Sequence, residues 1–389
     1  MKILVNGYFY GGNCPPFVFH LKENINYEVK LTNSLDFLDD YGINSDYLSD
    51  TDLIRIRTNF IERFLIKLLK KARIPVWKFF LIRKSKKLLK EFKPDIIINH
   101  KASVKAEIML RTKFQNQLTY IYGSEVHGNR IQDKILDFIF DNSKYILCTT
   151  ETMNQYITNS KPHLANKIKT LPWGYFEMNK ECNPTNDYNK GKLKEKLGIN
   201  KDCFVFLDTR SLRRIDAGLN PIVNAIKKLT SYRTDFKFIF LRGFLGADAM
   251  VNELKIAISN DRDLNKCVLI IDDVVSQNKL LELYTLSDAF ISILQADQFG
   301  ISILDAVFTD TALIISDLPV YRQYLGEKGP MYIHEQNVNE LYEAMVTVFN
   351  KSFGKIENEK YISLKEEFNP INTFNSITDF LNLTYKEIT

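Results

Sequence analysis

The chain lacks the features that mark membrane-spanning, disulfide-rich and metal-binding proteins. Its 389 residues contain no uncharged apolar run of about 18 residues, which excludes a transmembrane helix. The five cysteines are far apart and odd in number, and none has the Cys-x-x-Cys or Cys/His spacing typical of zinc sites. The amino-terminal segment has no basic region and no small-residue cleavage site, so no signal peptide is expected. These absences predict a reduced, cytoplasmic protein without a metal site.

The composition is that of a globular protein. Hydrophobic residues make up 45% of the chain and charged residues 25%, which is the balance of a folded, water-exposed protein. A chain of 389 residues is too long for one α/β core of ordinary size. We therefore expect two domains.

Positive charge is concentrated in one segment. Residues 63–93 carry twelve Lys and Arg against one acid, Glu91, whereas the net charge of the whole chain is only +5. Large apolar residues are interleaved with these cations: Phe64, Leu65, Leu68, Leu69, Trp77, Phe79, Phe80 and Leu81. This pattern favours a basic amphipathic surface that lies on an anionic membrane. The alternative is a solvated helical face over the domain core. Nucleic acid is not an expected partner, because no nucleic-acid-binding signature accompanies the segment.

Strand-like runs alternate with helical patterns almost throughout, which predicts parallel sheets built from βα units. The expected strands of the first half are residues 2–9, 95–99, 118–122, 145–149 and 168–172. Those of the second half are residues 204–208, 236–241, 268–271, 289–294 and 312–315, with helices at 221–229, 277–286 and 301–308.

Two further segments define the expected domain organisation. The polar stretch 179–196 is the best candidate for an interdomain linker. After Asn369-Pro370, residues 371–388 read as an amphipathic helix that we expect to pack back on the first domain. The expected domains are residues 1–180, residues 198–366, and a C-terminal helical segment, 367–389.

The strongest chemical signal lies within residues 288–324. A buried strand leads into a loop with Asp297, a helix opens near Gly300, and Asp305 falls about one turn inside that helix. Ligands of open α/β sheets bind beyond the carboxyl ends of strands, and free amides at a helix N-terminus suit phosphate. Two carboxylates there can bind sugar and ribose hydroxyls. The alternative is that Asp297 only caps the helix and Asp305 is solvated.

Residues 297–306, DQFGISILDA, resemble the donor-site signature E-x-F-G-x-x-x-x-E-A of retaining glycosyltransferase family 4, which has the GT-B fold. The two acids have the family spacing, with Asp in place of Glu at both ends. The resemblance implies that Asp297 faces the donor sugar and Asp305 the ribose. It also implies that Phe299, Gly300, Ile301 and Ser302 contact the donor, and that the backbone amides of the last three lie near its diphosphate.

A second match covers residues 204–229, FVFLDTRSLRRIDAGLNPIVNAIKKL. Arg210 stands where the family has its Arg, Thr209 replaces the preceding Gly, and Arg213 or Arg214 replaces the family Lys. Cations after a strand suit a diphosphate leaving group, which gains negative charge as the glycosidic bond breaks. The resemblance implies that Arg210 and Arg214 stabilise that charge. The alternative is a basic surface loop.

Two other loops of the second half resemble donor contacts of the family. Residues 270–276, IIDDVVS, are similar to the loop that contacts the nucleotide base through its backbone, which implicates Val274. Arg242 follows a strand and is also expected on the donor side.

The first half resembles the family only in outline. Gly11 and Gly12 lie in a glycine-rich loop after the first strand, where backbone can approach a ligand closely. Residues 122–128, YGSEVHG, resemble the family's His-Gly-Ser-Asp loop, with Tyr122 for His and Glu125 for Asp. His127 is close by in the sequence. It is expected either in the cleft or, equally, as a capping or structural residue.

The sequence thus predicts an α/β protein with the GT-B architecture: two Rossmann-like domains with parallel sheets that face each other across a cleft. The expected activity is transfer of a hexose-type sugar from a nucleoside diphosphate to a lipid-linked or surface-glycan acceptor, with retention of configuration. No cofactor is expected, because the nucleotide sugar is the substrate. We expect a cytoplasmic protein on the inner face of the cell membrane. The alternatives are a non-catalytic subunit that scaffolds a partner transferase, or a sugar-nucleotide epimerase.

Overall fold

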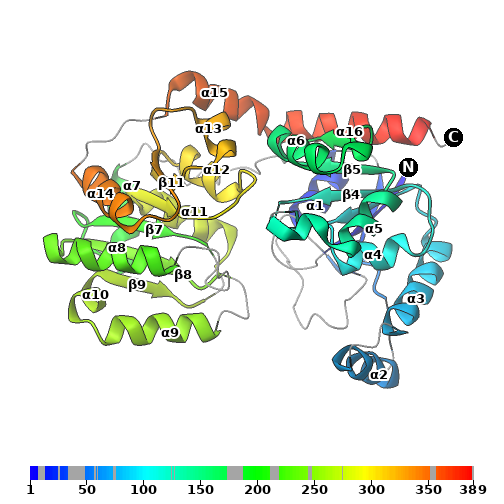
Figure 1. Ribbon diagram of the computed structural model, residues 1–389, viewed down its shortest axis with the longest axis horizontal. Helices are drawn as coiled ribbons and strands as arrows, with labels where there is room; N and C mark the ends of the chain where they lie inside the picture. Colours follow the sequence, from blue (N-terminus) through cyan, green and yellow to red (C-terminus); the bar gives the residue numbers. More distant parts are fainter. Residues whose placement is uncertain are drawn as a thin grey trace. The chain divides into compact units, whose positions relative to one another are not determined.

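The structure, a computed structural model (Figure 1), describes residues 1–7, 14–24, 27–33, 49–56, 58, 60–72, 76–123, 125–126, 128–172, 187–210, 219–243, 248–273, 275–350 and 356–387. The chain divides into two compact units. Unit 1 comprises Met1–Phe176 and Glu367–Thr389, and unit 2 comprises Glu177–Glu366. The chain therefore leaves unit 1 once and returns to it at its C-terminal end.

Unit 1 is built on a parallel sheet that has six strands among the described residues, in the order β2-β1-β3-β4-β5-β6. The strands are β1 (Lys2–Asn6), β2 (Glu28–Thr32), β3 (Ile96–His100), β4 (Gln117–Ile121), β5 (Tyr145–Cys148) and β6 (Ile168–Thr170). The helices are α1 (Cys14–Asn24), α2 (Phe60–Lys71), α3 (Val76–Phe92), α4 (Val104–Leu110), α5 (Lys134–Asn142), α6 (Glu151–Ser160) and α16 (Pro370–Lys386). Every residue of β3 and β4 is buried, as expected where helices cover both faces of a parallel sheet.

Unit 2 repeats this plan with the strand order β12-β11-β10-β7-β8-β9. Its strands are β7 (Phe204–Asp208), β8 (Phe236–Leu241), β9 (Val268–Ile271), β10 (Ala289–Ser292), β11 (Ala312–Ser316) and β12 (Met331–Ile333). Its helices are α7 (Asp187–Lys196), α8 (Leu219–Tyr232), α9 (Asp248–Ser259), α10 (Arg262–Cys267), α11 (Gln277–Leu286), α12 (Ile301–Phe308), α13 (Pro319–Leu325), α14 (Val338–Phe349) and α15 (Asn358–Glu367).

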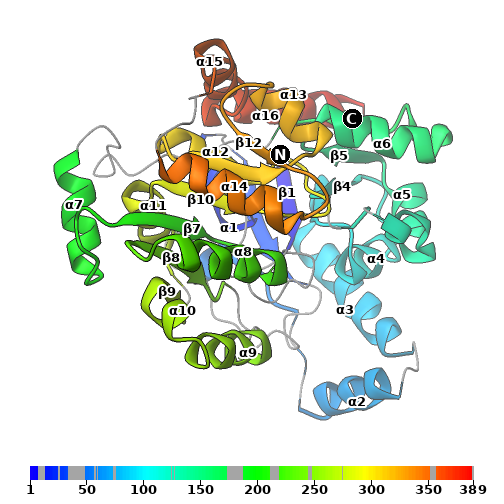
Figure 2. The same cartoon turned by 60° about the vertical axis from the view of Figure 1, so that its left-hand side comes forward.

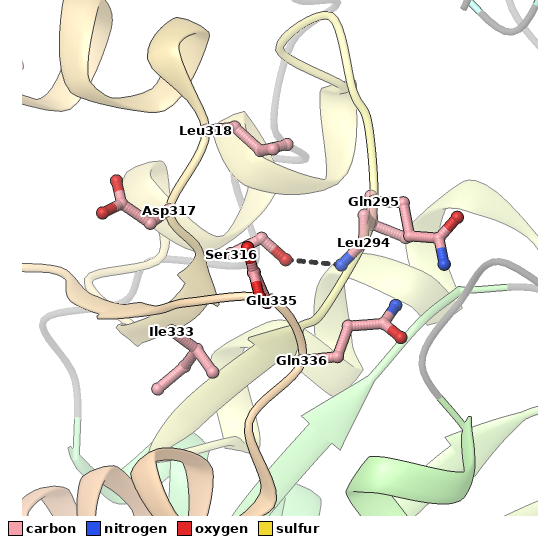
Figure 3. A pocket seen from close by; sticks show the side chains of 8 residues that line it. All are labelled: Leu294, Gln295, Ser316, Asp317, Leu318, Ile333, Glu335 and Gln336. Atoms are coloured by element: carbon pink, nitrogen blue, oxygen red, sulfur yellow. Dashed lines mark hydrogen bonds between the residues drawn. The ribbon is translucent and has the colours of Figure 1, made fainter. Parts of the chain in front are cut away.

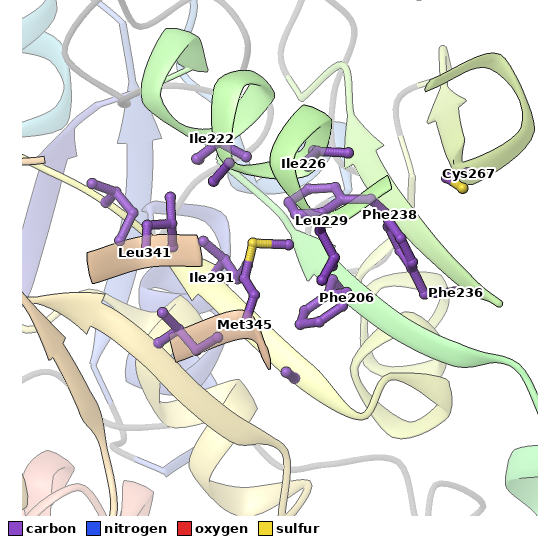
Figure 4. Close-up of a cluster of buried hydrophobic side chains, with 14 of the residues drawn as sticks. Phe206, Ile222, Ile226, Leu229, Phe236, Phe238, Cys267, Ile291, Leu341 and Met345 are labelled. Carbon is purple, nitrogen blue, oxygen red and sulfur yellow. The ribbon is translucent and has the colours of Figure 1, made fainter. Parts of the chain in front are cut away.

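The main core of unit 2 lies between its sheet and the helices α8 and α14 (Figure 4). Ile222, Ile226 and Leu229 recur at intervals of four and three along α8, so they share one face that is fully buried. The rings of Phe206 and Phe238 stack on the sheet below that face, with their centroids 6.1 Å apart. Large apolar side chains thus hold the strands in register at the centre of the unit.

The C-terminal helix α16 packs on unit 1. Asn369 caps its first turn and Pro370 occupies the first helical position, which starts the helix where the chain turns. Phe374 then lies against Phe17 of α1, with ring centroids 6.3 Å apart. Phe380 packs edge-on against Tyr145 at the start of β5. Aromatic contacts with one helix, α1, and one strand, β5, therefore fix α16 to unit 1.

Two strands were not predicted, and one predicted linker is partly wrong. Both β2 and β12 are edge strands. β2 is interrupted by the charged Glu28 and Lys30, and β12 is only three residues long, so the apolar pattern of each is weak. Residues 187–196 of the predicted linker form α7 of unit 2, which therefore begins before residue 198. The Lys194 ammonium is buried there, and it donates to the Cys203 carbonyl and to Asp288.

The packing of α16 leads to a testable difference between two positions of one helix. Phe374 is buried, whereas Ile371 of the same helix is 69% exposed. Phe374→Ala should lower the free energy of unfolding of unit 1 by about 3–5 kcal/mol, the usual cost of truncating a buried Phe. Ile371→Ala is the matched control and should change it by less than about 0.5 kcal/mol. Denaturant unfolding measures both, and equal stability of the two variants would contradict the docking of α16.

Candidate functional site

The strand order of unit 2 defines a site at the carboxyl ends of its inner strands. The chain runs from β7 outward through β8 and β9, and then crosses to β10 on the other side of β7. The loops that leave β7 and β10 therefore diverge in opposite directions at the carboxyl ends of two neighbouring strands. In open α/β sheets this topological switch point is where ligands bind.

A buried ion pair occupies this switch point. Arg210, two residues past β7, lies 3.1 Å from the carboxylate of Asp297 in the loop after β10, and their side chains are only 13% and 11% exposed. The Arg210 Nε also donates to the hydroxyl of Ser292 on β10. The pair joins positions 87 residues apart in the sequence. It fixes the two diverging loops to each other.

Asp297 is held in its ionised form by four donors. Burial raises the pKa of its carboxyl, but the Arg210 charge, the Tyr321 hydroxyl and the backbone amides of Gly300 and Gln298 outweigh burial and leave the pKa lowered. Tyr321 of α13 donates to the same oxygen as Arg210, at 2.7 Å, and the Gly300 amide donates at 3.0 Å. Gly300 is the N-cap residue of α12, and Asp297 accepts the Gly300 amide just before the first turn, so the alternative that Asp297 only caps the helix is wrong.

The N-terminus of α12 opens directly beside the ion pair. A Cβ built on Gly300 would lie 3.3 Å from the Asp297 carboxylate, 3.5 Å from the Arg210 guanidinium and 3.6 Å from the Ser302 hydroxyl. The Ser302 hydroxyl is buried and has no hydrogen-bond partner among the described residues. Phe299 takes a left-handed backbone conformation (φ 59°), which costs free energy for a non-glycine residue. A cation, a carboxylate and an unpaired hydroxyl therefore converge where a helix presents its free amides.

Asp305 lies deeper, one turn inside α12. It is only 1% exposed, so the alternative of a solvated carboxylate is wrong for this residue. Burial raises the pKa of the Tyr284 hydroxyl, and the nearby charge of Asp305 raises it further. Tyr284 also hydrogen-bonds to the Thr209 hydroxyl, at 2.7 Å, beside Arg210. Asp305 therefore belongs to the same buried polar group as the ion pair.

Arg242 is positioned by two acids. It follows β8 and pairs with Asp248 of α9 and, at 2.9 Å, with Asp272 after β9. The other candidates, Arg214, Val274, Gly11, Gly12 and His127, lie outside the described residues.

Unit 1 has its own switch point, between β1 and β3. The Tyr122 hydroxyl lies 2.6 Å from Nε2 of His100, the last residue of β3. Burial lowers the pKa of His100 to about 3, so its imidazole is neutral in the physiological range. Glu125 is also buried, and its carboxylate accepts the Tyr122 amide. Tyr122 and Glu125 thus sit together in unit 1, whereas Arg210, Asp297 and Asp305 belong to unit 2.

Several residues of these clusters were missed by sequence reasoning. Tyr321 and Ser292 reach the ion pair only because the sheet order brings α13 and β10 beside β7. His100 could have been found, because it directly follows a predicted strand at the carboxyl end, where site residues gather. No group of three or more metal-ligating side chains occurs in the part of the chain that the structure describes.

With this geometry established, comparison with known proteins identifies the architecture. Sucrose-phosphate synthase from Thermosynechococcus elongatus superposes with a TM-score of 0.74 at 12% identity, over 99% of both chains. HepE from Anabaena, solved in complex with UDP and glucose, superposes with a TM-score of 0.73 at 13% identity, over 98% of this chain and 99% of HepE. The chain has the GT-B fold.

Sequence comparison is narrower in extent. This GT-B chain is 27% identical over 212 residues to mannosylglucosylglycerate synthase from Petrotoga mobilis, a stretch that covers 46% of this chain and 49% of that enzyme. The match thus spans about half the length of the curated relative. No protein-family model matches the sequence.

The buried carboxyl of Asp208, at the end of β7, should make the stability of the protein depend on pH. Burial raises its pKa to about 7, although the Arg210 amide and charge oppose this. The pKa of an Asp in the unfolded chain is about 3.9. Between about pH 4 and pH 7 the folded state therefore keeps a proton that the unfolded state has lost, and the free energy of unfolding falls as the pH rises through this range. Asp208→Asn retains the acceptor for the Arg210 amide without the charge. The difference between its thermal midpoint and that of the wild type should therefore increase as the pH rises from about 4 to about 7.

The exposed Asp202 provides the control. Asp202→Asn should follow the wild-type pH profile of the thermal midpoint. If the Asp208→Asn profile also runs parallel to wild type, the Asp208 carboxyl is not protonated in the folded protein near neutral pH.

Proposed function

We propose that the chain is a nucleotide-sugar-dependent glycosyltransferase that transfers a hexose-type sugar with retention of configuration. The observation that carries this proposal is the buried pair of Arg210 and Asp297 beside the open N-terminus of α12. A fixed cation and free helix amides suit a diphosphate, and a carboxylate beside them suits sugar hydroxyls. The three relatives support the proposal, because each acts on or binds sugars or nucleotides by its printed description.

Each residue has a specific role in the proposed reaction. Arg210, with Arg214, stabilises the nucleoside diphosphate as its bond to the anomeric carbon breaks. Asp297 orients the sugar, and Asp305 binds the ribose. The acceptor hydroxyl forms the new bond to the same carbon and passes its proton to an oxygen of the departing phosphate. Neither a metal ion nor a cofactor is required in this scheme, because cations and helix amides neutralise the diphosphate.

The donor is best sought by thermal stabilisation with a panel of nucleotide sugars. UDP-glucose is the first candidate, because HepE binds UDP and glucose. A donor at about 100 times its dissociation constant should add about 2.7 kcal/mol to the stability of the protein. Binding without turnover in the presence of acceptors would favour the alternative of a non-catalytic subunit that scaffolds a partner transferase.

Removal of the cation is the direct test of the site. Arg210→Ala should lower turnover by about 10²–10³-fold, the usual effect of losing one group that stabilises the developing charge. It should also weaken the binding of the free nucleoside diphosphate, as measured by calorimetry.

Arg233→Ala is the matched control. Arg233 also belongs to unit 2 and pairs with a carboxylate, Asp235, but it lies at the opposite ends of the strands, just before β8. Its loss should leave turnover and nucleotide affinity unchanged. Unchanged nucleotide affinity in Arg210→Ala would remove Arg210 from the proposed site.

We further propose that unit 1 lies on the anionic inner face of the cell membrane through α2 and α3, and that the acceptor is a lipid-linked or surface glycan. Phe60, Phe64 and Leu68 recur every four residues of α2, and all are more than half exposed, with Phe60 at 83%. Large contiguous apolar surface on a folded protein marks an interaction site. In both Figure 1 and Figure 2, α2 lies at the periphery of unit 1, away from its strands.

The charge of α2 favours lipid over an apolar partner protein. Lys67, Lys70 and Lys71 are exposed on the same helix as the apolar residues, and a salt bridge from Glu62 to Lys84 fixes α2 to α3. A helix with an apolar face and flanking cations suits the boundary between acyl chains and anionic headgroups. No described helix is long and apolar enough to cross a bilayer. The association is therefore proposed as peripheral.

Liposome binding tests this surface. Adsorption should increase with the anionic lipid content and decrease with salt, because screening shortens to about 8 Å at about 0.15 M. Replacement of Lys70, Lys71, Lys86 and Lys87 with Gln should remove roughly 4 kcal/mol of adsorption free energy, about a thousandfold in affinity, if all four face lipid.

A control variant removes the same charge elsewhere. Lys227, Lys266, Lys328 and Lys365 are exposed residues of unit 2, and their replacement with Gln should leave adsorption unchanged. Equal sedimentation of the wild-type protein with neutral and anionic liposomes would rule out the electrostatic membrane role.

A further inference from the structure

A polar pocket lies in unit 2, on the other side of β10 from the ion pair (Figure 3). It opens at the carboxyl ends of β10, β11 and β12 and has a volume of about 330 Å³. That volume falls at the lower end of the range of small-molecule sites. The Leu294 amide donates to the Ser316 hydroxyl at 2.6 Å and so fixes the pocket wall to the loop that carries Asp297.

Hydrogen-bonding groups of this pocket are available to a ligand. The Nε2 of Gln336 is buried and has no hydrogen-bond partner among the described residues, which is costly unless a ligand or water binds it. In the view of Figure 3, the side chains of Gln295 and Gln336 extend to the same side of the pocket. Amides that donate and accept suit a partner rich in hydroxyl groups.

The backbone at Gln336 is held in a costly conformation. Glu335 (φ 45°) and Gln336 (φ 60°) are consecutive non-glycine residues in the left-handed region. Such conformations cost about 1–3 kcal/mol each and persist where the surrounding structure requires them, often at ligand sites. The strain at these two residues fixes the direction in which the Gln336 side chain leaves the backbone.

The charges around the pocket select against an anion. Among the residues that the structure describes, no Lys, Arg or His lines it, whereas two acids, Asp317 and Glu335, do. The Asp317 carboxylate is already compensated, because it accepts from Arg322 at 2.7 and 2.9 Å and lies 2.8 Å from the ring of His334. A nucleoside diphosphate is therefore disfavoured. The remaining carboxylate, that of Glu335, is exposed and would offer a metal cation a single protein ligand.

We propose that this pocket binds a neutral saccharide unit, separately from the donor. The amides of Gln295 and Gln336 bind its hydroxyls, and Leu318 and Ile333 contact the apolar face of the ring. The unit is either part of the acceptor glycan or a free sugar that acts on the donor loop. Both sources present the same ring chemistry.

The test uses the methyl α-glycosides of glucose, mannose and galactose as probes, with saturation-transfer NMR and calorimetry of the whole protein. At least one should bind saturably, and Gln336→Gly should weaken it about tenfold, the value of one hydrogen bond to a ligand. Glycine favours the left-handed backbone, so this variant removes the side chain without a folding penalty. Lys113→Gly, at an exposed left-handed residue of unit 1, is the matched control and should bind as wild type does.

Two further results decide where the sugar sits. Binding should persist in Arg210→Ala, and its loss there would place the glycoside in the donor site and overturn the proposal. Equal binding by wild type and Gln336→Gly, or no saturable binding of any probe, would also overturn it. No donor is present in these measurements, so a failure of nucleotide-sugar transfer would leave this result intact.

When donor is added, the products separate the two sources. A glycosylated probe, found by mass spectrometry, identifies the pocket as part of the acceptor site. Unchanged probe with an altered rate of donor hydrolysis identifies it as an effector site. Either product supports a saccharide pocket, provided that Gln336→Gly diminishes the effect.

Discussion

The structure of unit 2 depends on the need to pair two buried charges. A guanidinium and a carboxylate removed from water are tolerated only when each has a partner and further hydrogen bonds, which Arg210 and Asp297 provide for each other. The pair requires the ends of β7 and β10 to be neighbours, and Tyr321 and Gly300 complete the coordination of the carboxylate. The positions of α12 and α13 thus follow from one electrostatic constraint.

Much of this architecture could be predicted from the sequence, because central strands of a parallel sheet are covered on both faces. β3, β4, β10 and β11 are fully buried and therefore appear as mainly apolar runs with helical segments between them. Asp297 was identified in the loop that follows one such run, and Arg210 was identified by a family motif that begins with another. Position after a buried strand is information that a single sequence carries.

The remaining features depend on which strands are neighbours, and a single sequence does not specify that order. The contact of Tyr122 with His100 joins the end of β3 to the residue after β4. The pocket beside Gln336 requires the edge strand β12, which is three residues long and was not predicted. For α2, the sequence pattern fits a helix that buries its apolar face equally well. Only the exposure of Phe60 and Phe64 distinguishes the two cases.

The return of the chain to unit 1 affects the order in which the protein folds during synthesis. The side chains of Phe374, Ile377 and Leu381 in α16 complete the core of a unit whose described strands lie before residue 171. Unit 2 is contiguous in sequence, so it can fold as soon as it leaves the ribosome, whereas unit 1 waits with an uncovered apolar face. Through the synthesis of roughly 190 intervening residues, at about 5–20 residues per second, that face is exposed for some ten to forty seconds. The nascent chain is therefore most vulnerable to aggregation, and most dependent on chaperones, while its second unit is already folded.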